Sequence, residues 1–263
     1  MRQPQTSPVP IDERVAAVAE AGYSGMGLVA DDLVAIRDTI GFDGLRTLLA
    51  DNALAHVEIE LIERWWIPRG QPGHTYDVRD VLFAAADALE PKFIKIGSEL
   101  GLRAADIGPL IGPLRELADQ AADHGTKIAI ETMPFSIIAT VPMGAELVTA
   151  AGHSGVGLLI DAWHVFRAGT SLDELAEALT PEMIFGVELN DAASEVIGEL
   201  FEDTVERRLL CGDGSFNLAD LIGVLRDKGF DGPWGIEILS RTFRTLPPRE
   251  GLKLAADTTR ALL

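Results

Sequence analysis

Cysteine is almost absent from this chain. Cys211 is the one cysteine in 263 residues, so no intramolecular disulfide can form and nothing calls for an oxidising compartment. We interpret Cys211 as a packed or loop thiol rather than a nucleophile, because no activating neighbour stands near it in the sequence. A chain of this length can bury a sizeable core without such cross-links.

Long hydrophobic runs are also missing. No segment approaches the roughly 20 apolar residues that a membrane-spanning helix needs. The N-terminal residues 1–10 are polar and proline-rich, and they lack the apolar stretch of a signal peptide. We therefore expect a cytoplasmic protein that does not interact with membranes.

Basic residues are scarce relative to acidic ones. The chain has 22 lysines and arginines against 41 aspartates and glutamates, which gives a formal net charge of −19 at pH 7. A surface this acidic repels nucleic acids and anionic membranes. The composition thus argues against a nucleic-acid partner, and it says nothing about the fold.

The sequence does contain a repeated pairing of a short apolar strand with an amphipathic helix. Strand-like segments lie at residues 23–29, 55–61, 92–97, 127–133, 155–161, 184–190 and 234–239. Helix-like segments lie near residues 11–21, 31–51, 76–90, 105–124, 143–151, 172–179, 217–229 and 250–262. Alternation of this kind predicts βαβ units and a parallel sheet.

This pattern favours an α/β fold, a (β/α)8 TIM barrel whose first strand is poorly defined or missing. A closed barrel of this type has eight strands, and residues 1–10 do not resemble a strand. Either a poor strand lies there, or the barrel is open or shortened at that edge. The sequence shows no linker, low-complexity segment or short repeat, so we predict a single domain over residues 1–263.

Acidic residues alternate with branched aliphatic residues along the strand-like segments. Because side chains of a strand alternate between two faces, the aliphatic residues form a row facing the helices, and the small and charged residues form an interior row. Four acids of the interior row stand at or near the carboxyl ends of consecutive strands, where barrel active sites are built: Glu131, Asp161, Glu188 and Glu237. We expect these four to converge on one mouth.

Carboxylates that converge in this way favour a bound metal. Mutual repulsion and desolvation oppose the ionisation of such a group of acids, and a divalent cation removes the conflict. Carboxylate oxygens suit Mg²⁺ or Mn²⁺. We therefore expect one divalent cation, Mn²⁺ or Mg²⁺, with the four acids as ligands. The alternative for any single acid is a salt bridge at the rim or a helix cap.

Further side chains are expected near the mouth. Lys95 lies in the interior row with Glu58 and Glu60; it could hold a substrate oxygen or offset the acids, and a structural ion pair is the alternative. Trp65 stands in the loop region beyond its strand and could stack on a sugar ring, with ordinary packing or an oligomer contact as the alternatives. The acidic segment 192–206 is expected to form a mobile loop or an extra helix over the site.

Four segments together resemble the xylose isomerase-like TIM barrel superfamily, the sugar phosphate isomerase and epimerase family. They are IETMPFS (130–136), LIDAWHVFRAG (159–169), VELNDA (187–192) and RRLLCGDGSFNLADLIGVLRDKGFDGPWGIEILS (207–240). The resemblance runs from about residue 11 to the C-terminus. Each segment alone is weakly specific, but their order and spacing are specific for the superfamily, although not for one reaction.

The resemblance implies roles for individual residues. Glu131 and Glu237 match metal ligands that also act as the two catalytic acid/base groups on opposite sides. Asp161 matches a further ligand, and His164 matches a histidine that contacts substrate oxygens. Arg208, or its neighbour Arg207, matches a substrate-binding arginine.

One position departs from the pattern of the family. The family usually has histidine or glutamine three residues before the aspartate that is Asp191 here, and this chain has Glu188 in that place. Glu188 could ligate the metal directly or stand beside it as an extra acid. A fourth carboxylate would make the site more anionic and favour a hard cation.

The resemblance implies an enzyme, a divalent-metal-dependent isomerase or epimerase that acts on a sugar, keto-sugar or related polyol. The reaction would proceed by proton transfer through a metal-bound enediolate: the metal polarises a carbonyl, one glutamate removes a proton and another returns it. A small-molecule carbohydrate or polyol would be the substrate. The resemblance also favours a homodimer or homotetramer.

Other functions are weighed against this one. A lyase or dehydratase of the inosose or dehydroshikimate type would share the opening step and then expel a β-hydroxyl. A repair nuclease of the endonuclease IV type would need a histidine-rich zinc cluster and a basic surface, which five scattered histidines and a charge of −19 argue against. A non-catalytic barrel subunit is disfavoured by the intact acids and supported by the departure at Glu188 and the missing first strand.

Overall fold

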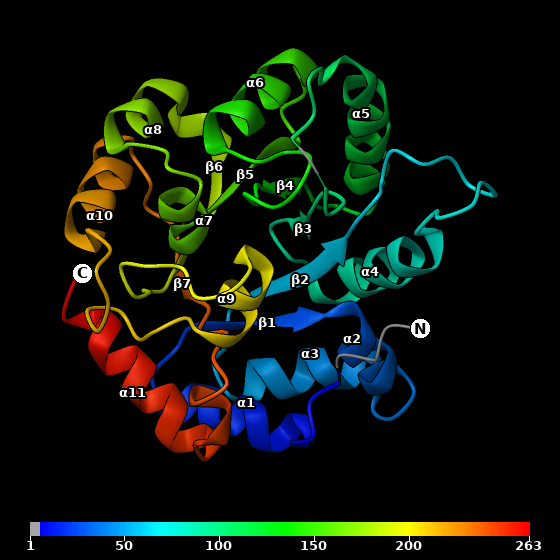
Figure 1. The fold of residues 1–263 in the computed structure, drawn as a ribbon. Coiled ribbons are helices and arrows are strands. Elements are labelled where there is room, and N and C mark those ends of the chain that lie inside the picture. Colours follow the sequence, from blue (N-terminus) through cyan, green and yellow to red (C-terminus); the bar gives the residue numbers. More distant parts are fainter. Residues whose placement is uncertain (1–5, 102) are drawn as a thin grey trace.

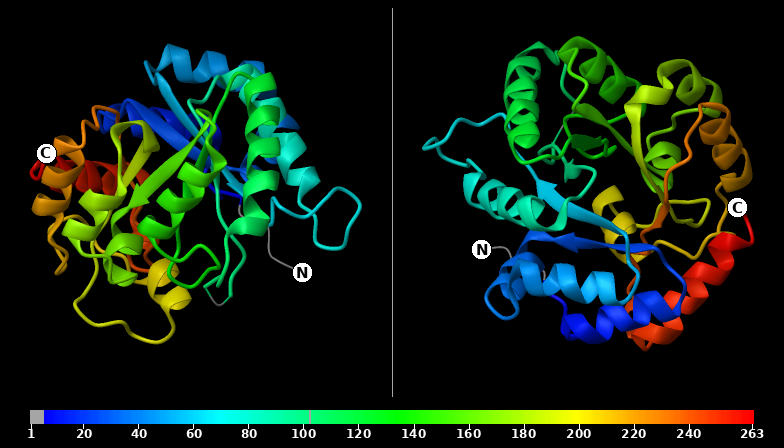
Figure 2. Two further views of the ribbon diagram at one scale, coloured as in Figure 1. Left: turned by 90° about the horizontal axis from the view of Figure 1, so that it is seen from above. Right: turned by 180° about the vertical axis from the view of Figure 1, so that it is seen from behind.

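The structure, a computed structural model, describes residues 6–101 and 103–263. Within these residues, parallel strands form one sheet in chain order: β1 (Gly25–Val29), β2 (His56–Ile62), β3 (Ile94–Ile96), β4 (Ile128–Glu131), β5 (Val156–Asp161), β6 (Ile184–Leu189) and β7 (Trp234–Ile236). Helices surround the strands on the outside (Figure 1, Figure 2). The predicted TIM barrel fold is confirmed, and each of the seven expected strands is present.

The helices follow the strands along the chain. They are α1 (Ile11–Glu20), α2 (Ala30–Arg37), α3 (Gly41–Asp51), α4 (Tyr76–Leu89), α5 (Gly108–Asp123), α6 (Val141–Ala151), α7 (Ala162–Arg167), α8 (Leu172–Ala178), α9 (Leu200–Glu206), α10 (Leu218–Asp227) and α11 (Pro248–Arg260). Among the described residues, none of these helices is long and apolar enough to cross a membrane.

The prediction of one helix over residues 31–51 is wrong. The chain forms two helices there, α2 and α3, and Gly41 at the start of α3 has a φ of +71°. Glycine adopts this left-handed conformation at low cost, so the chain can turn between the two helices. The short helix α7 was also not expected; it follows β5 directly, and its six residues are too few to show a helical period.

The strands place their branched aliphatic side chains against the helices, as their alternation predicts. Ile94, Ile96, Ile128 and Ile130 are fully buried and belong to the main hydrophobic cluster of the protein. A separate small cluster, which contains Phe93, Ala129 and Leu159, lies on the interior face. The same alternation therefore separates a helix-facing core from the interior of the barrel.

Two glycines leave room for aromatic rings in the barrel. A Cβ atom at Gly157 of β5 would lie 2.6 Å from the ring of Phe185, and one at Gly186 of β6 would lie 2.7 Å from the ring of Phe93. Such distances are too short for non-bonded atoms, so a larger residue would displace the rings. The two glycines of the interior row therefore leave space inside the barrel that these aromatic rings fill.

The sheet is open between β1 and β7. Among the described residues, β1 pairs with β2 alone and β7 with β6 alone, and residues 6–10 form no strand. A cavity of about 500 Å³ opens at this edge, lined by Gly25 of β1 and Trp234 of β7 together with Glu58, Glu60 and Glu237. This agrees with a first strand that is poorly defined or missing, and the opening reaches the acidic interior of the barrel.

Candidate metal and active site

The four predicted metal ligands come together inside the barrel. Glu131 and Asp161 end β4 and β5, Glu188 lies in β6 and Glu237 follows β7. Each offers one carboxylate oxygen, and these atoms all lie within 4.8 Å of one another. The parallel register explains the convergence, since Asp161 pairs with Glu188 and Glu188 with Gly235. We call these four residues the carboxylate ring.

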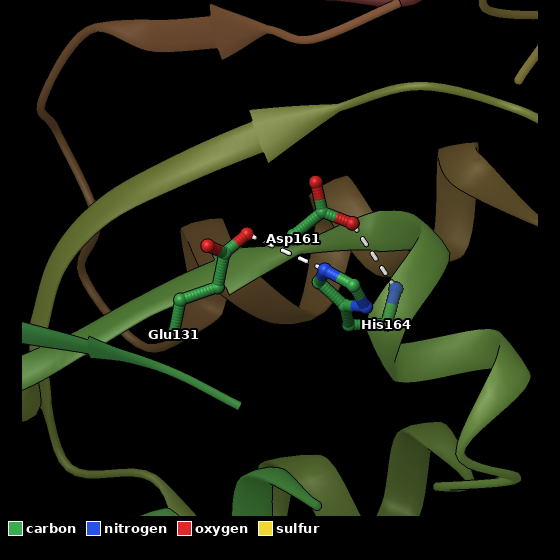
Figure 3. Close-up of side chains that lie close together, drawn as sticks. All are labelled: Glu131, Asp161 and His164. Atoms are coloured by element: carbon green, nitrogen blue, oxygen red, sulfur yellow. Dashed lines mark hydrogen bonds and ion pairs between the residues drawn. The ribbon is translucent and has the colours of Figure 1, made fainter. Parts of the chain in front are cut away.

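His164 joins the ring from the short helix α7. Asp161 caps this helix, and its Oδ1 accepts a hydrogen bond of 3.1 Å from the backbone N–H of His164. The imidazole Nε2 lies 3.4 Å from Oε1 of Glu131 (Figure 3). The other ring nitrogen, Nδ1, is buried and has no hydrogen-bond partner in the part of the chain that the structure describes. His164 is therefore placed beside the ring with one polar atom unused.

Lys95 projects from β3 into the ring. Its Nζ lies 2.7 Å from Glu60 Oε2 and 2.9 and 3.1 Å from the two carboxylate oxygens of Glu188. Glu131 and Glu237 are more distant, at 3.7 and 3.6 Å. We call Lys95, Glu60 and Glu188 the Lys95 side of the site. Its close contacts are with carboxylates, which favours the ion-pair alternative considered for this lysine.

Arg208 reaches the opposite part of the ring from the chain that follows α9. Its Nη1 donates hydrogen bonds of 2.8 Å to Asp161 Oδ2 and 2.7 Å to Glu237 Oε2. Its Nε and Nη2 both donate to the hydroxyl of Thr204, at 3.1 and 2.8 Å. We call Arg208, Asp161 and Glu237 the Arg208 side. The neighbouring Arg207 pairs with Glu202 instead, so Arg208 is the arginine of the site.

The acids of the ring differ in how readily they ionise, because two buried cations cannot offset them all. Although burial opposes it, the charge of Lys95 and the hydrogen bond with His164 lower the pKa of Glu131 to about 2. Burial raises the pKa of Glu188 well above its usual value, and that of Glu60 is raised for the same reason. Burial alone would lower the pKa of Lys95, but the surrounding carboxylates raise it well above its usual value. An ionised Glu131 thus lies beside carboxyl groups that resist ionisation.

This donor set fits a divalent cation. The four carboxylates of the ring and that of Glu60 face two buried cations, Lys95 and Arg208, so acids are in excess. A further positive charge would relieve the repulsion among them. Carboxylate oxygens, with the imidazole of His164 close by, are ordinary ligands of divalent metals. The site can therefore hold a divalent metal.

Three polar residues of the site received no role from the sequence: Glu60, Asn190 and Thr204. Asn190 is fully buried, and its Nδ2 donates a 2.9 Å hydrogen bond to Oδ2 of Asp161. The alternation of the strands places both Glu60 and Asn190 in the interior row, so the signal for them was present. Thr204 lies on α9, where no sequence pattern points to the site.

Two residues considered from the sequence lie in the core. Trp65 is 2% exposed, and its indole N–H donates a 2.9 Å hydrogen bond to the carbonyl of Gly97. A tryptophan enclosed in this way offers no free face to a sugar ring, which favours the packing alternative over the predicted substrate role. Cys211 is also buried, and burial raises the pKa of its thiol to about 11. Both observations agree with structural roles.

The segment 192–206 ends in the helix α9 beside the site, which agrees with the expected extra helix. Figure 1 shows α9 in front of the strands. The ring of Phe201 on α9 lies 5.6 Å from that of Phe135, and the ring of Phe135 lies 5.8 Å from the imidazole of His164. Asp203 on the same helix accepts a 3.2 Å hydrogen bond from the indole of Trp163. An apolar wall therefore stands next to the His164 edge of the ring.

Curated proteins similar to this chain are enzymes. An inosose isomerase from Halalkalibacterium halodurans is 30% identical over 151 residues, which cover 57% of this chain and 52% of that protein. A 3-dehydroshikimate dehydratase from Pseudomonas aeruginosa is 27% identical over 271 residues, which cover 96% of this chain and 39% of that protein. The chain thus spans about half or less of the length of these relatives.

A solved structure and a family model agree on the fold. The structure of the IOLI protein with a bound zinc atom has a TM-score of 0.83 at 20% identity, and the match covers 97% of this chain and 93% of that chain. The sequence model of the family described as "Xylose isomerase-like TIM barrel" matches residues 15–262. That match covers nearly the whole chain, which therefore belongs to the xylose isomerase-like TIM barrel family.

Proposed function

We propose that this chain is a divalent-metal-dependent isomerase or epimerase of a sugar, keto-sugar or related polyol. One observation carries the proposal: Glu131 and Glu237 reach the same carboxylate ring from the ends of different strands. A reaction that removes a proton beside a carbonyl and returns it to another atom or face needs two such groups around one substrate. The relative named as an inosose isomerase supports this class of reaction.

The metal that we propose is Mn²⁺ or Mg²⁺, held by carboxylates of the ring, because hard oxygen donors dominate the site. When bound, it would polarise the carbonyl of the substrate and stabilise the negative charge that forms on proton removal. We expect one ion per chain.

We assign proton transfer and substrate binding to individual side chains of the site. The low pKa of Glu131 keeps this carboxylate ionised and available as a metal ligand. Glu131 would accept the proton of the substrate, and Glu237 would return a proton from the other side. The Nε2 of His164 faces the ring, and we propose that this imidazole binds a substrate oxygen. Most N–H groups of Arg208 are hydrogen-bonded within the protein. We therefore propose that its main role is to orient Asp161 and Glu237 rather than to bind substrate.

A dehydratase is the second candidate. The relative that is named a 3-dehydroshikimate dehydratase aligns with 96% of this chain, whereas the inosose isomerase aligns with 57%. A lyase would begin with the same proton abstraction, after which the bond between the β-carbon and its hydroxyl oxygen breaks and water leaves. The same carboxylates could serve both reactions.

Product analysis separates these functions. The Mn²⁺-loaded protein would be incubated in D₂O with inosose, ketohexoses and 3-dehydroshikimate. An isomerase or epimerase yields an isomer of its substrate that carries solvent deuterium, seen by NMR, whereas a dehydratase yields a product lighter by one water with a new ultraviolet absorption. If protein that binds Mn²⁺ converts none of them, the proposed activity on these substrates is wrong and a non-catalytic barrel is favoured.

A further inference from the structure

The Lys95 side already contains a cation that belongs to the protein. The three shortest contacts of the ammonium are with Glu60 at 2.7 Å and with the two oxygens of Glu188 at 2.9 and 3.1 Å. An ammonium has three N–H donors, and these three contacts account for them. Glu131 and Glu237, at 3.7 and 3.6 Å, lie beyond hydrogen-bond distance.

Glu188 differs from the other members of the ring in how it meets the cations of the protein. Both of its oxygens face one ammonium, whereas Asp161 and Glu237 each give Arg208 a single oxygen. Glu131 lies 3.7 Å from the ammonium of Lys95 and 3.4 Å from the imidazole of His164. A divalent cation bound to Glu188 would therefore stand beside the charge of Lys95, and like charges a few ångströms apart repel strongly in a buried site.

The position of Lys95 is fixed by its place in the sheet and by its ion pairs. It occupies the middle of the three-residue strand β3, paired with Glu60 of β2 on one side and Ala129 of β4 on the other. Its side chain is 2% exposed, so the ammonium itself is shielded from solvent. If it moved away, Glu60 and Glu188 would lose their counterion in a buried environment, which is costly.

We propose that Lys95 is a positioning residue that withholds Glu188 from the metal, so that Glu131, Asp161 and Glu237 are the protein's carboxylate ligands. The inference rests on the proposed function in that it assumes a divalent cation in the ring. Mn²⁺ and Mg²⁺ favour octahedral coordination, and a set without Glu188 keeps one more position open for the oxygens of a hydroxy-ketone. Lys95 then stands between Glu60 and Glu188 beside the ion and offsets part of their charge.

Mn²⁺ binding to the metal-free protein tests this inference without reference to turnover. Calorimetry, with electron paramagnetic resonance of the free ion, would compare the wild type with three single variants. Glu188→Gln is expected to bind Mn²⁺ within about threefold of the wild type, whereas Glu131→Gln binds more than about 100-fold more weakly. Lys95→Met is expected to tighten binding by at least about tenfold, because it removes a like charge and frees Glu188.

A double variant and a folding control complete the experiment. Lys95→Met/Glu188→Gln should bind Mn²⁺ more weakly than Lys95→Met, because it lacks the carboxylate at position 188 and so loses the part of the gain that comes from Glu188. If Lys95→Met does not fold, as judged by circular dichroism, Lys95→Met/Glu60→Gln takes its place with the charge balanced. A loss of affinity in Glu188→Gln equal to that in Glu131→Gln would overturn the inference and make Glu188 a ligand. If the wild type itself binds no Mn²⁺, the proposed function fails, which is a separate outcome.

Discussion

The Arg208 side and the Lys95 side of the site are built from the same kinds of group. On each side one buried cation contacts two carboxylates: Arg208 contacts Asp161 and Glu237, and Lys95 contacts Glu60 and Glu188. The sides differ in how the cation meets the acids. Arg208 takes a single oxygen from each acid, whereas Lys95 meets both oxygens of Glu188.

The cause of this difference is the shape of the two cations. A guanidinium is a planar fork with its donors at fixed angles, so Arg208 can anchor two nitrogens on Thr204 and still direct the third at two acids. An ammonium is a compact charge whose three donors can all meet nearby acids. A buried arginine can thus orient two carboxylates through one nitrogen, whereas a buried lysine can direct all of its donors at nearby carboxylates. The Arg208 side is suited to orienting ligands, and the Lys95 side holds one cation against both oxygens of Glu188.

The largest loss of activity is expected from a substitution of Glu237, on the Arg208 side. Glu237→Gln removes an acid/base group but keeps an oxygen that can accept the hydrogen bond of Arg208, so the fold should persist. We expect kcat to fall by about 10²- to 10⁴-fold, the usual contribution of such a group. Product formation, measured with whichever compound of the D₂O screen is converted, checks this together with circular dichroism. Turnover at the wild-type rate would show that the acid/base role is assigned to the wrong residue.

Asp161→Asn tests the same side through the metal. Asp161 contributes a ligand oxygen and also accepts hydrogen bonds from Arg208 and Asn190. We expect Mn²⁺ affinity to fall by more than about 100-fold, since even partners outside the ligand shell can cost that much. Calorimetric titration measures it, with the exposed Asp173→Asn on α8 as a matched control. If Glu188→Gln lost the same affinity, the proposed distinction between the two sides would disappear.

His164→Ala tests whether the imidazole contributes to substrate binding or to metal binding. The backbone N–H of residue 164 makes the cap with Asp161, and alanine retains it. We therefore expect the Mn²⁺ affinity to change little and the KM to rise by about tenfold, the value of one lost hydrogen bond. Steady-state kinetics and calorimetry on the same preparation provide both numbers. Equal losses in the two would place the imidazole among the metal ligands.

The smallest expected effect concerns the Lys95 side and the stability of the protein. Burial raises the pKa of Glu58 from 4.5 to about 7, against the opposing charge of Lys95. A carboxyl group whose pKa is raised in the folded state stabilises the fold fully below its unfolded pKa, and this contribution is lost as the pH rises from about 4.5 to about 7. Glu58→Gln removes that dependence.

The variant should therefore be more stable than the wild type at pH 8, by about 1–2 kcal/mol because Glu58 is partly exposed, and the difference should vanish near pH 4. Urea unfolding in the presence of a chelator at the two pH values measures it, with the exposed Glu195→Gln as control. A constant difference between the two pH values would show that titration of Glu58 does not contribute.

Much of the fold and part of the site could be predicted from the sequence because strands have a period of two. The alternation in IAIE (128–131) and VGLLID (156–161) assigns each side chain to a face without knowledge of any contact. Parallel strands also bring their carboxyl ends to one edge, so Glu131, Asp161, Glu188 and Glu237 could be expected together. The helix break at Gly41 could not be read reliably, because the pattern of 31–51 also suits one long helix.

Contacts between distant segments could not be predicted in this way. Lys95 and Glu188 are 93 positions apart, and no local sequence pattern around either residue indicates that the two are in contact. Arg207 and Arg208 are adjacent and chemically identical, yet one pairs with Glu202 on the surface and the other enters the site. Trp65 could equally stack on a ligand or pack, since both roles need the same aromatic ring, and the bond to Gly97 distinguishes them.

The sequence by itself determined the class of the fold, the interior row of the strands and the four acids that meet there, because these depend on a local period that every strand repeats. The tertiary structure decided which acid meets Lys95, which meets Arg208 and which aromatic residues are enclosed. Those contacts depend on the register between strands and on distances of a few ångströms between side chains from distant segments, and these distances exist only once the chain has folded.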